Sequence, residues 1–338
     1  MDFIIDFISV KNADAIIVWL KKDNIDYVFF IDGGKAANSK DVIDHYNLYI
    51  KENVNNPTLI IINSHPHSDH LYGLIEIVDY FGKDISHAVY NDPMKYISNE
   101  RKQEILDYYG DDQDVNYLHG VFNRVKLLND QCQKYNINRL DAFSDLNDKY
   151  SGLFRILGPS KKFYKEKVDF FTSVENLNKY DYSKKGNSFV NEEDENLKPC
   201  VIVDQENDAS PENLTSTIIE FTDSSNKKYL LTADCGIDSF ESAEANGFNL
   251  NGGFELAQLP HHGSRRNVSA YWLHRISPNY YVVSAEGTTK HPRRAVINCI
   301  KRNINNCNVY STHKSGTLSI TTNRAIFPVR GWGNAEGL

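Results

Sequence analysis

The sequence of 338 residues lacks a long hydrophobic run. Its longest apolar stretch, residues 15–20, is far shorter than the ~20 residues that a membrane-spanning helix needs. The sequence also lacks a basic, signal-like N-terminus, because Asp2 and Asp6 stand where a signal peptide carries positive charge. These two absences argue against secretion and against a membrane partner, and they predict a cytoplasmic protein.

Cysteine is scarce. The chain has five cysteines, an odd number, and no two of them stand in a C-x-x-C spacing. Such scatter argues against a disulfide framework and against a zinc knuckle built from cysteines. With 41% hydrophobic and 24% charged residues, the composition is ordinary for a globular protein, which excludes disorder as the main state.

The net charge of −8 argues against a protein that binds polyanions over its whole surface. The charge is nevertheless uneven along the chain. Residues 260–302, here called the basic window, contain eight basic residues and one acidic residue, Glu286. The window is either a solvated surface or a site for an anionic ligand, and the motifs inside it bear on that choice.

Apolar patterning predicts an α/β or a layered α+β protein that forms a single domain over residues 1–338. The stretch 58–63 is apolar on both faces and is predicted to be a buried strand, followed by an amphipathic helix at 71–81. The last apolar stretches, 317–321 and 325–329, are predicted to form a hairpin. Two segments depart from the alternation: a helical insertion at about 91–150 and a charged surface loop at about 161–199.

Three histidines and an aspartate fall within six residues directly after the buried strand, in His65-Pro66-His67-Ser68-Asp69-His70. Neutral imidazole is the commonest zinc ligand, and a carboxylate adds a hard oxygen donor. His65 and His67 share a face of the extended chain and are expected to bind one ion. Asp69 and His70 stand where the chain turns into a helix and are expected to bind a second. Paired ions are the usual arrangement for hydrolysis at phosphorus or carbonyl centres.

This segment resembles the H-x-H-x-D-H signature of the metallo-β-lactamase-fold hydrolases, and the resemblance spans roughly residues 3–330. Residues 30–34 resemble the family's early aspartate-glycine turn, and residues 230–234 resemble its L-x-T-G-D strand end. The Pro-His-His-Gly-Ser of residues 260–264, with His291-Pro292, resembles one branch in particular. That branch is the nuclease-like domain attached to the ComEC/Rec2 DNA-uptake channel.

The resemblance implies a four-layer αββα sandwich with a metal cleft at one edge of the two sheets. It implies that Asp32 supports the site from behind and that Asp234 bridges two metals. The implied cofactor is Zn²⁺, as one or two ions, with Mn²⁺ as an alternative. The expected ligands are His65, His67, Asp69, His70, Asp234 and His262.

The sequence departs from the family at three places. The glycine-rich V-G-x-G-D turn is replaced by Ser-Val-Lys-Asn-Ala-Asp at residues 9–14, and Ala233 replaces the glycine before the bridging aspartate. Residues 158–160 read Gly-Pro-Ser where many relatives place another histidine ligand. One ion then has fewer protein ligands, or His261 or His291 fills the gap.

The expected mechanism uses a metal-activated water that Asp69 or Asp234 orients and deprotonates to hydroxide, with His291 as the acid for the leaving group. This chemistry serves phosphodiesters, thioesters and lactams equally well. The basic window favours phosphate, because the arginine fork matches phosphate geometry. The groups predicted to bind substrate are His261, Arg265, Arg266, Lys290, Arg293 and Arg294.

We therefore predict a metal-dependent phosphodiesterase or nuclease whose substrate is a nucleic acid strand, single-stranded rather than a long duplex, or a nucleotide-like molecule. Two alternatives stay open: a thioester or lactone hydrolase, and a metal-binding sensor or scaffold without turnover. A further alternative concerns the cations, which in that case form ion pairs with the acidic block at 192–195 and do not touch substrate.

Overall fold

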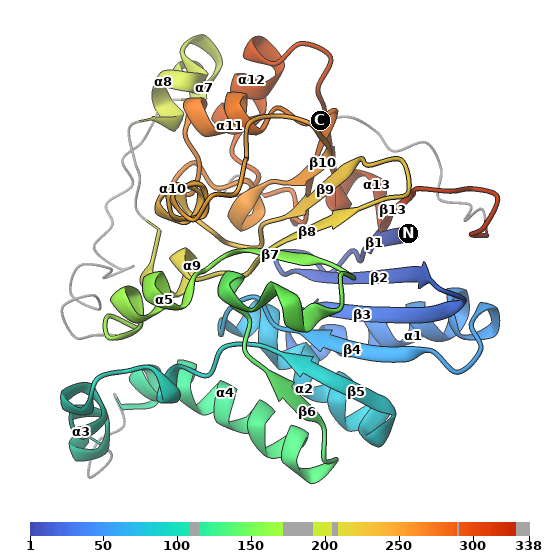
Figure 1. The fold of residues 1–338 in the computed structure, drawn as a ribbon. Helices are drawn as coiled ribbons and strands as arrows, with labels where there is room; N and C mark the ends of the chain where they lie inside the picture. Colours follow the sequence, from blue (N-terminus) through green and yellow to red (C-terminus); the bar gives the residue numbers. More distant parts are fainter. Residues whose placement is uncertain (109–114, 172–191, 205–208, 289–290, 329–338) are drawn as a thin grey trace.

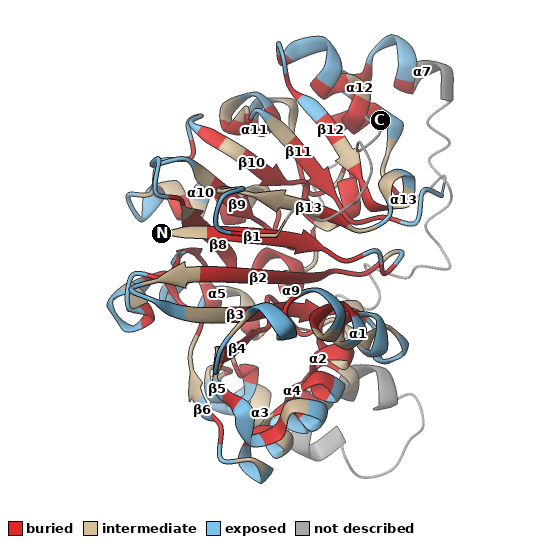
Figure 2. Cartoon of the chain, turned by 90° about the vertical axis from the view of Figure 1, so that its right-hand side faces the viewer, coloured by how far each residue is buried: buried red, intermediate tan, exposed pale blue. Residues whose placement is uncertain are grey.

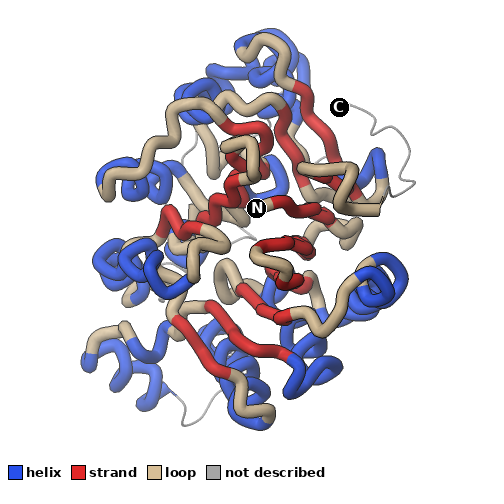
Figure 3. Tube along the Cα trace, turned by 45° about the vertical axis from the view of Figure 1, so that its right-hand side comes forward, coloured by secondary structure: helices blue, strands red, loops and turns tan. Residues whose placement is uncertain are grey.

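The computed structural model describes residues 1–108, 115–171, 192–204, 209–288 and 291–328. Within them, two β-sheets are stacked face to face and helices cover both outer faces, which gives four layers (Figure 1). Figure 3 shows the same arrangement, with the strands inside and the helices outside. The α/β class and the αββα sandwich expected from the sequence are confirmed.

The first sheet has seven strands among the described residues, in the order β13-β1-β2-β3-β4-β5-β6. Neighbours from β13 to β3 are antiparallel, and β3 to β6 are parallel. The strands are β1 (Asp2–Phe7), β2 (Ala15–Lys22), β3 (Ile25–Gly33), β4 (Thr58–Ile62), β5 (Ile85–Val89), β6 (Asn138–Leu140) and β13 (Leu318–Thr321).

The second sheet, over the same described residues, has the order β12-β11-β10-β9-β8-β7. Here β7, β8 and β9 are antiparallel, and β9 to β12 are parallel. The strands are β7 (Arg155–Gly158), β8 (Ile218–Thr222), β9 (Lys228–Leu231), β10 (Phe254–Gln258), β11 (Tyr280–Val283) and β12 (Asn308–Ser311). Both sheets thus carry a parallel half whose strands end at one edge.

Helices pack on the outer face of each sheet and bury one side there (Figure 2). The first sheet is covered by α1 (Ser39–Tyr49), α2 (Ser68–Phe81) and α4 (Val115–Lys134). The second is covered by α10 (Ile237–Ala245), α11 (Ala270–Ile276) and α12 (Arg294–Asn303). The other helices of the described residues are α3 (Asn99–Tyr108), α5 (Lys161–Val168), α7 (Glu192–Leu197), α8 (Pro199–Val203), α9 (Pro211–Leu214) and α13 (Thr312–Ser315).

Strand alternation explains how the layers hold together. Ile60 and Ile62 of β4 point into the core between the sheets, whereas Leu59 and Ile61 point toward the helices. Both faces of this strand are therefore covered, as its continuous apolar run predicts. No helix of the described residues has both the length and the hydropathy of a membrane span.

The ends and insertions differ from expectation in three ways. The predicted hairpin of 317–321 with 325–329 is wrong, because β13 pairs with β1 and Phe327 packs on Trp19, with ring centroids 5.0 Å apart. Within 91–150, β6 is an edge strand of the first sheet. Within 161–199, the described parts form α5, α7 and α8, where a loop was predicted.

Cys200 of α8 and Cys299 of α12 form a disulfide that their spacing does not predict.

Candidate metal centre

Four segments from distant parts of the chain meet where the parallel strands of both sheets end. They are the loop after β4 with the first turn of α2, the loop after β9, the turn after β10, and the connection from β1 to β2. In open α/β sheets, ligands bind outside the carboxyl ends of the strands. The topology therefore gathers the candidate ligands at one edge of the sandwich.

The H-x-H-x-D-H segment has the predicted local structure. His67 is the extended residue that precedes α2, with φ −76° and ψ 155°, and Asp69 and His70 lie in the first turn of the helix. The rings of His65 and His67 are 4.7 Å apart, and those of His65 and His70 are 4.2 Å apart. One short segment thus presents three imidazoles and a carboxylate to the same place.

Asp32, at the end of β3, holds this segment from behind. Its carboxylate accepts hydrogen bonds from Nδ1 of His70 at 2.7 Å and from the backbone N–H of Ser64 at 2.8 Å. The contact requires a close approach of α2 to β3. A Cβ added at Gly73 would lie 1.8 Å from the carbonyl oxygen of Gly33, so a side chain there would push the helix away.

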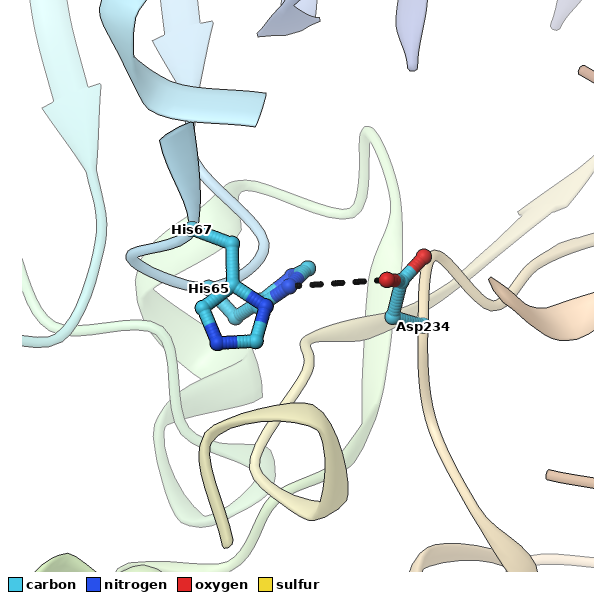
Figure 4. A group of neighbouring side chains, drawn as sticks. All are labelled: His65, His67 and Asp234. Atoms are coloured by element: carbon cyan, nitrogen blue, oxygen red, sulfur yellow. Dashed lines mark ion pairs between the residues drawn. The ribbon is translucent and has the colours of Figure 1, made fainter. Parts of the chain in front are cut away.

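Asp234 follows β9 and faces His65 and His67 from the opposite side of the centre (Figure 4). Its Oδ2 is 3.8 Å from Nε2 of His65, and its Oδ1 is 3.4 Å from Nε2 of His70. The preceding residue, Ala233, has φ 46°, and the side chain of Gln258 accepts from its backbone N–H at 3.0 Å. A left-handed residue thus turns the chain sharply and aims Asp234 at the centre.

The turn after β10, a 3-10 helix at Pro260–Gly263, supplies the next candidates. His261 and His262 have φ 48° and 56°, which brings both rings to the centre. Nε2 of His262 is 3.7 Å from Oδ2 of Asp69, and Nε2 of His261 is 3.7 Å from Oδ2 of Asp234. Gly263 allows the turn to pack, since a Cβ there would lie 2.8 Å from Cβ of Pro292.

Three groups of side chains each have ligand atoms within 4.8 Å of one another. The six ligands predicted from the sequence are all among them, and Asp234 and His262 each belong to two groups. The groups are His65, His67 and Asp234; Asp69, His70 and His262; and Asp14, Asp234 and His262.

Asp14 is the member that sequence reasoning missed. It closes the 9–14 segment, where the chain departs from the glycine-rich turn of the family, and it stands just before β2. The available signal was the aspartate itself, which occupies the last position of the V-G-x-G-D pattern although both glycines are absent.

Hydrogen bonds fix which ring nitrogen faces the centre. Nδ1 of His70 contacts the Asp32 carboxylate, and Nδ1 of His262 contacts the carbonyl oxygen of Ser284 at 2.9 Å. Both partners only accept, so Nδ1 carries a proton and Nε2 of the neutral ring has a free lone pair. The hydroxyl of Ser64 donates to Asp32 and lies 3.1 Å from Nδ1 of His65, which leads to the same tautomer there.

The buried charges of the centre favour a cation. Burial opposes the charged form of His262, but the carboxylates of Asp234, Asp69 and Asp14 outweigh it and raise its pKa to about 9. Burial and the neighbouring rings of His70 and His67 hold the pKa of His65 well below its usual range. Negative charge that stabilises a proton on His262 would equally stabilise a metal ion.

The residues fit a metal by an independent criterion. Five buried atoms at the centre have no hydrogen-bond partner among the described residues: Nε2 of His65, His70 and His262, and Oδ1 of Asp14 and Asp234. Buried polar atoms are normally paired, because an unpaired one costs free energy. Nitrogen and oxygen donors that converge without partners are what a divalent ion requires.

His291 and the cations of the basic window occupy varied positions. The ring of His291 is buried and lies 5.5 Å from that of His261 and 5.9 Å from that of His262. Arg265 is buried, Arg266 is half-buried and Arg294 is exposed. Lys290 lies outside the described residues. Arg293 forms an ion pair with Glu195, the alternative that the sequence left open.

Helix α4 of the predicted insertion lies beside the ligand loop. Nε of Arg124 donates to the carbonyl oxygen of Pro66 at 2.8 Å, and its guanidinium lies 5.7 Å from the ring centre of Tyr72 in α2. The helix therefore contacts the backbone between His65 and His67.

No protein-family model and no curated protein matches this sequence. Among solved structures, the chain is similar to the metallo-β-lactamase-fold protein YhfI from Bacillus subtilis, at 10% identity over 95% of this chain and 100% of that one, with a TM-score of 0.44. It is similar to a long-form RNase Z from yeast at 9% identity, over 94% of this chain and 42% of that one, with a TM-score of 0.40.

A third similar structure is a Cronobacter sakazakii metallo-β-lactamase with a HARLDQ motif, at 16% identity and a TM-score of 0.19. That match covers 25% of this chain and 30% of the other. The solved structures to which this chain is similar thus include metallo-β-lactamase-fold proteins, and at such identities the similarity does not extend to a substrate.

Proposed function

We propose that this chain is a metal-dependent hydrolase of phosphoesters, with a single nucleic acid strand or a nucleotide-like molecule as substrate. The observation that carries the proposal is the convergence of five unpartnered, buried ligand atoms from four segments. Such a set would destabilise an ordinary packed core, because each buried polar atom costs free energy unless it has a hydrogen-bond partner or a metal ion.

The groups divide into two positions that share Asp234. His65 and His67 would hold one ion with Asp234, and Asp69, His70 and His262 would hold the other. A divalent ion supplies a Lewis acid that polarises the substrate and acidifies water. Asp69 or Asp234 would orient the attacking water and take its proton. His291, packed against His261 and His262, donates a proton to the leaving group.

Phosphate is favoured by the residues that follow the turn after β10. Arg265 and Arg266 come directly after that turn, and the backbone N–H of Arg266 contacts Oγ of Ser264 at 3.2 Å. Arginine binds phosphate with two parallel hydrogen bonds, whereas a lactone or thioester needs no such cation. We leave Arg293 out of the binding set, because Glu195 neutralises it. The resemblance of residues 260–264 and 291–292 to the ComEC/Rec2 nuclease-like domain supports the same substrate class.

The test is hydrolysis of bis-(p-nitrophenyl) phosphate in Zn²⁺ and in Mn²⁺. We expect the double variant His67→Ala, Asp69→Ala and the single variant Asp234→Asn to lose at least about 100-fold in kcat/KM. Circular dichroism checks that both remain folded. Retained activity in either variant would contradict the metal-dependent mechanism.

Parallel assays with a thioester and a lactone panel distinguish the alternatives. Hydrolysis of those esters without phosphodiester cleavage would overturn the substrate class and keep the metallohydrolase. Metal binding without hydrolysis of any class would identify a sensor or scaffold.

Two arginine variants test the phosphate contacts. Arg266→Ala is expected to raise KM and to flatten the salt dependence of single-strand binding, by about 0.7 in the log–log slope for each lost contact. Arg293→Ala is the matched control, since its loss breaks an ion pair and lowers the melting temperature while KM stays unchanged. An unchanged KM in Arg266→Ala would contradict the phosphate contact.

A further inference from the structure

Asp14 lies in the candidate metal centre and belongs to none of the motifs that predicted the metal ligands. Its side chain is 1% exposed. The backbone on both sides is anchored, because its N–H donates to the carbonyl oxygen of Asp69 at 3.2 Å and its carbonyl accepts from Gly34 at 2.8 Å. The connection from β1 to β2 is thereby fixed against the ligand segments.

The two carboxylate oxygens of Asp14 have different surroundings. Oδ2 accepts from Nε2 of Gln258 at 2.9 Å and lies 4.0 Å from Nδ1 of His70. Oδ1 is buried and has no hydrogen-bond partner among the described residues. The bond to Oδ2 thus orients the carboxylate, and both lone pairs of Oδ1 remain available to a metal ion.

Ligand atoms of Asp14, Asp234 and His262 lie within 4.8 Å of one another, and the latter two also offer unpartnered atoms. Two buried carboxylates side by side repel each other unless a cation lies between them. Gln258 reinforces this placement, because its Oε1 accepts from the backbone of Thr232 and Ala233 in the loop that carries Asp234. One amide side chain therefore sets the spacing of both carboxylates.

We infer that Asp14 is a further metal ligand, which joins Asp69, His70, His262 and Asp234 at the second position and makes that position the tighter of the two. This inference rests on the proposed metal centre. The first position has His65, His67 and the shared Asp234, and the chain offers no histidine at residues 158–160 to complete it. Three carboxylates against one give the second position the greater attraction for a divalent ion.

Titration of the metal-free, full-length protein with Mn²⁺ and with Zn²⁺ by calorimetry tests the inference without any substrate. The wild type is expected to bind two equivalents in two resolved steps. Asp14→Asn keeps the shape and the contact with Gln258 but places an amide N–H₂ at the centre. It is expected to weaken the tight step by at least about tenfold and to leave the weak step within about twofold. His67→Ala is expected to do the reverse.

Stability of the metal-free protein gives a second measurement. A ligand carboxylate that repels Asp234 in the absence of metal predicts that metal-free Asp14→Asn melts at the same temperature as the wild type or higher. A merely structural Asp14 predicts a lower melting temperature and equal weakening of both steps. The control is Asp6→Asn, which removes another buried carboxylate, one that is bonded to His45 and Ser319 and belongs to none of the three ligand groups.

Native affinity for both equivalents in Asp14→Asn would overturn the inference. So would a single step in the wild type that His67→Ala abolishes. Metal binding as described, together with no phosphodiester hydrolysis, would contradict the proposed function and leave the role of Asp14 intact.

Discussion

Four residues around the candidate centre have left-handed backbone: Asp32, Ala233, His261 and His262, with φ of 53°, 46°, 48° and 56°. This conformation costs a residue with a Cβ roughly 1–2 kcal/mol. These four residues stand where ligands or their supporting groups leave the strands, which is where function commonly accounts for backbone strain. Ala233 is the one member whose side chain offers no ligand or supporting group, so no side-chain contact offsets its strain.

Replacement of Ala233 by glycine is expected to raise the free energy of unfolding by up to about 1 kcal/mol, because glycine adopts positive φ without strain. Metal affinity should stay unchanged. Urea denaturation measures the effect. Ala257→Gly is the control: Ala257 is buried within β10, and glycine there is expected to destabilise by a similar amount. Equal destabilisation by both changes would show that the turn at 233 is not strained.

At the scale of elements, α4 is the piece of the insertion that contacts the centre, through Arg124 and the carbonyl oxygen of Pro66. This bond holds the backbone between two ligands, and outer contacts of this kind typically change metal affinity by 10–100-fold. The insertion therefore does more than extend the helical layer.

Arg124→Ala is expected to weaken metal binding at the His65–His67 position by about tenfold, with little change in melting temperature, because the side chain is half-buried. Competition with a chromophoric chelator measures the affinity. Lys126→Ala, two residues along α4, removes an exposed charge that pairs with Asp130 and should change nothing. Equal affinities in the two variants would exclude a positioning role for Arg124.

Apolar periodicity predicted the elements that pack on neighbours close in the sequence, and those with a clear apolar face. The strand at 58–63 and the helix that starts after His67 follow from apolar periodicity, and the order of the six ligands followed from the resemblance. The pairing of β13 with β1, the three-residue β6 and the placement of Asp14 depend on contacts between residues far apart in the chain. The charge of 161–199 predicted a loop, but Ser160 caps α5 and buried Tyr164 and Val168 anchor it.

At the scale of the whole molecule, the centre joins the two sheets. Asp14 and the H-x-H-x-D-H segment come from the first sheet, and Asp234 and His262 from the second. A metal held by ligands this far apart in sequence binds the folded state and scarcely the unfolded one. It therefore stabilises the protein by mass action.

At a free metal concentration 100 times the dissociation constant, the stabilisation is about 2.7 kcal/mol. This corresponds to a rise of about 5 °C or more in melting temperature. Differential scanning fluorimetry with and without EDTA measures the shift. Asp234→Asn should melt at the same temperature in both conditions, because it removes the ligand shared by the two positions. A wild type that is indifferent to EDTA would contradict a resident metal.

The pairing of β1 with β13 also sets an order of events during synthesis. Asp6 and Phe7 pair with Ser319 and Leu318, so β1, the first strand to be synthesised, gains this neighbour only after β13, the last strand of the described residues, has been made. At ribosomal rates of 5–20 residues per second, about 300 residues take roughly 15–60 s. For that interval β1 is an open sheet edge of apolar sequence, the kind of surface that pairs with another chain. The nascent chain is therefore most prone to aggregate before β13 has been synthesised. A chaperone that covers β1 would act during that interval.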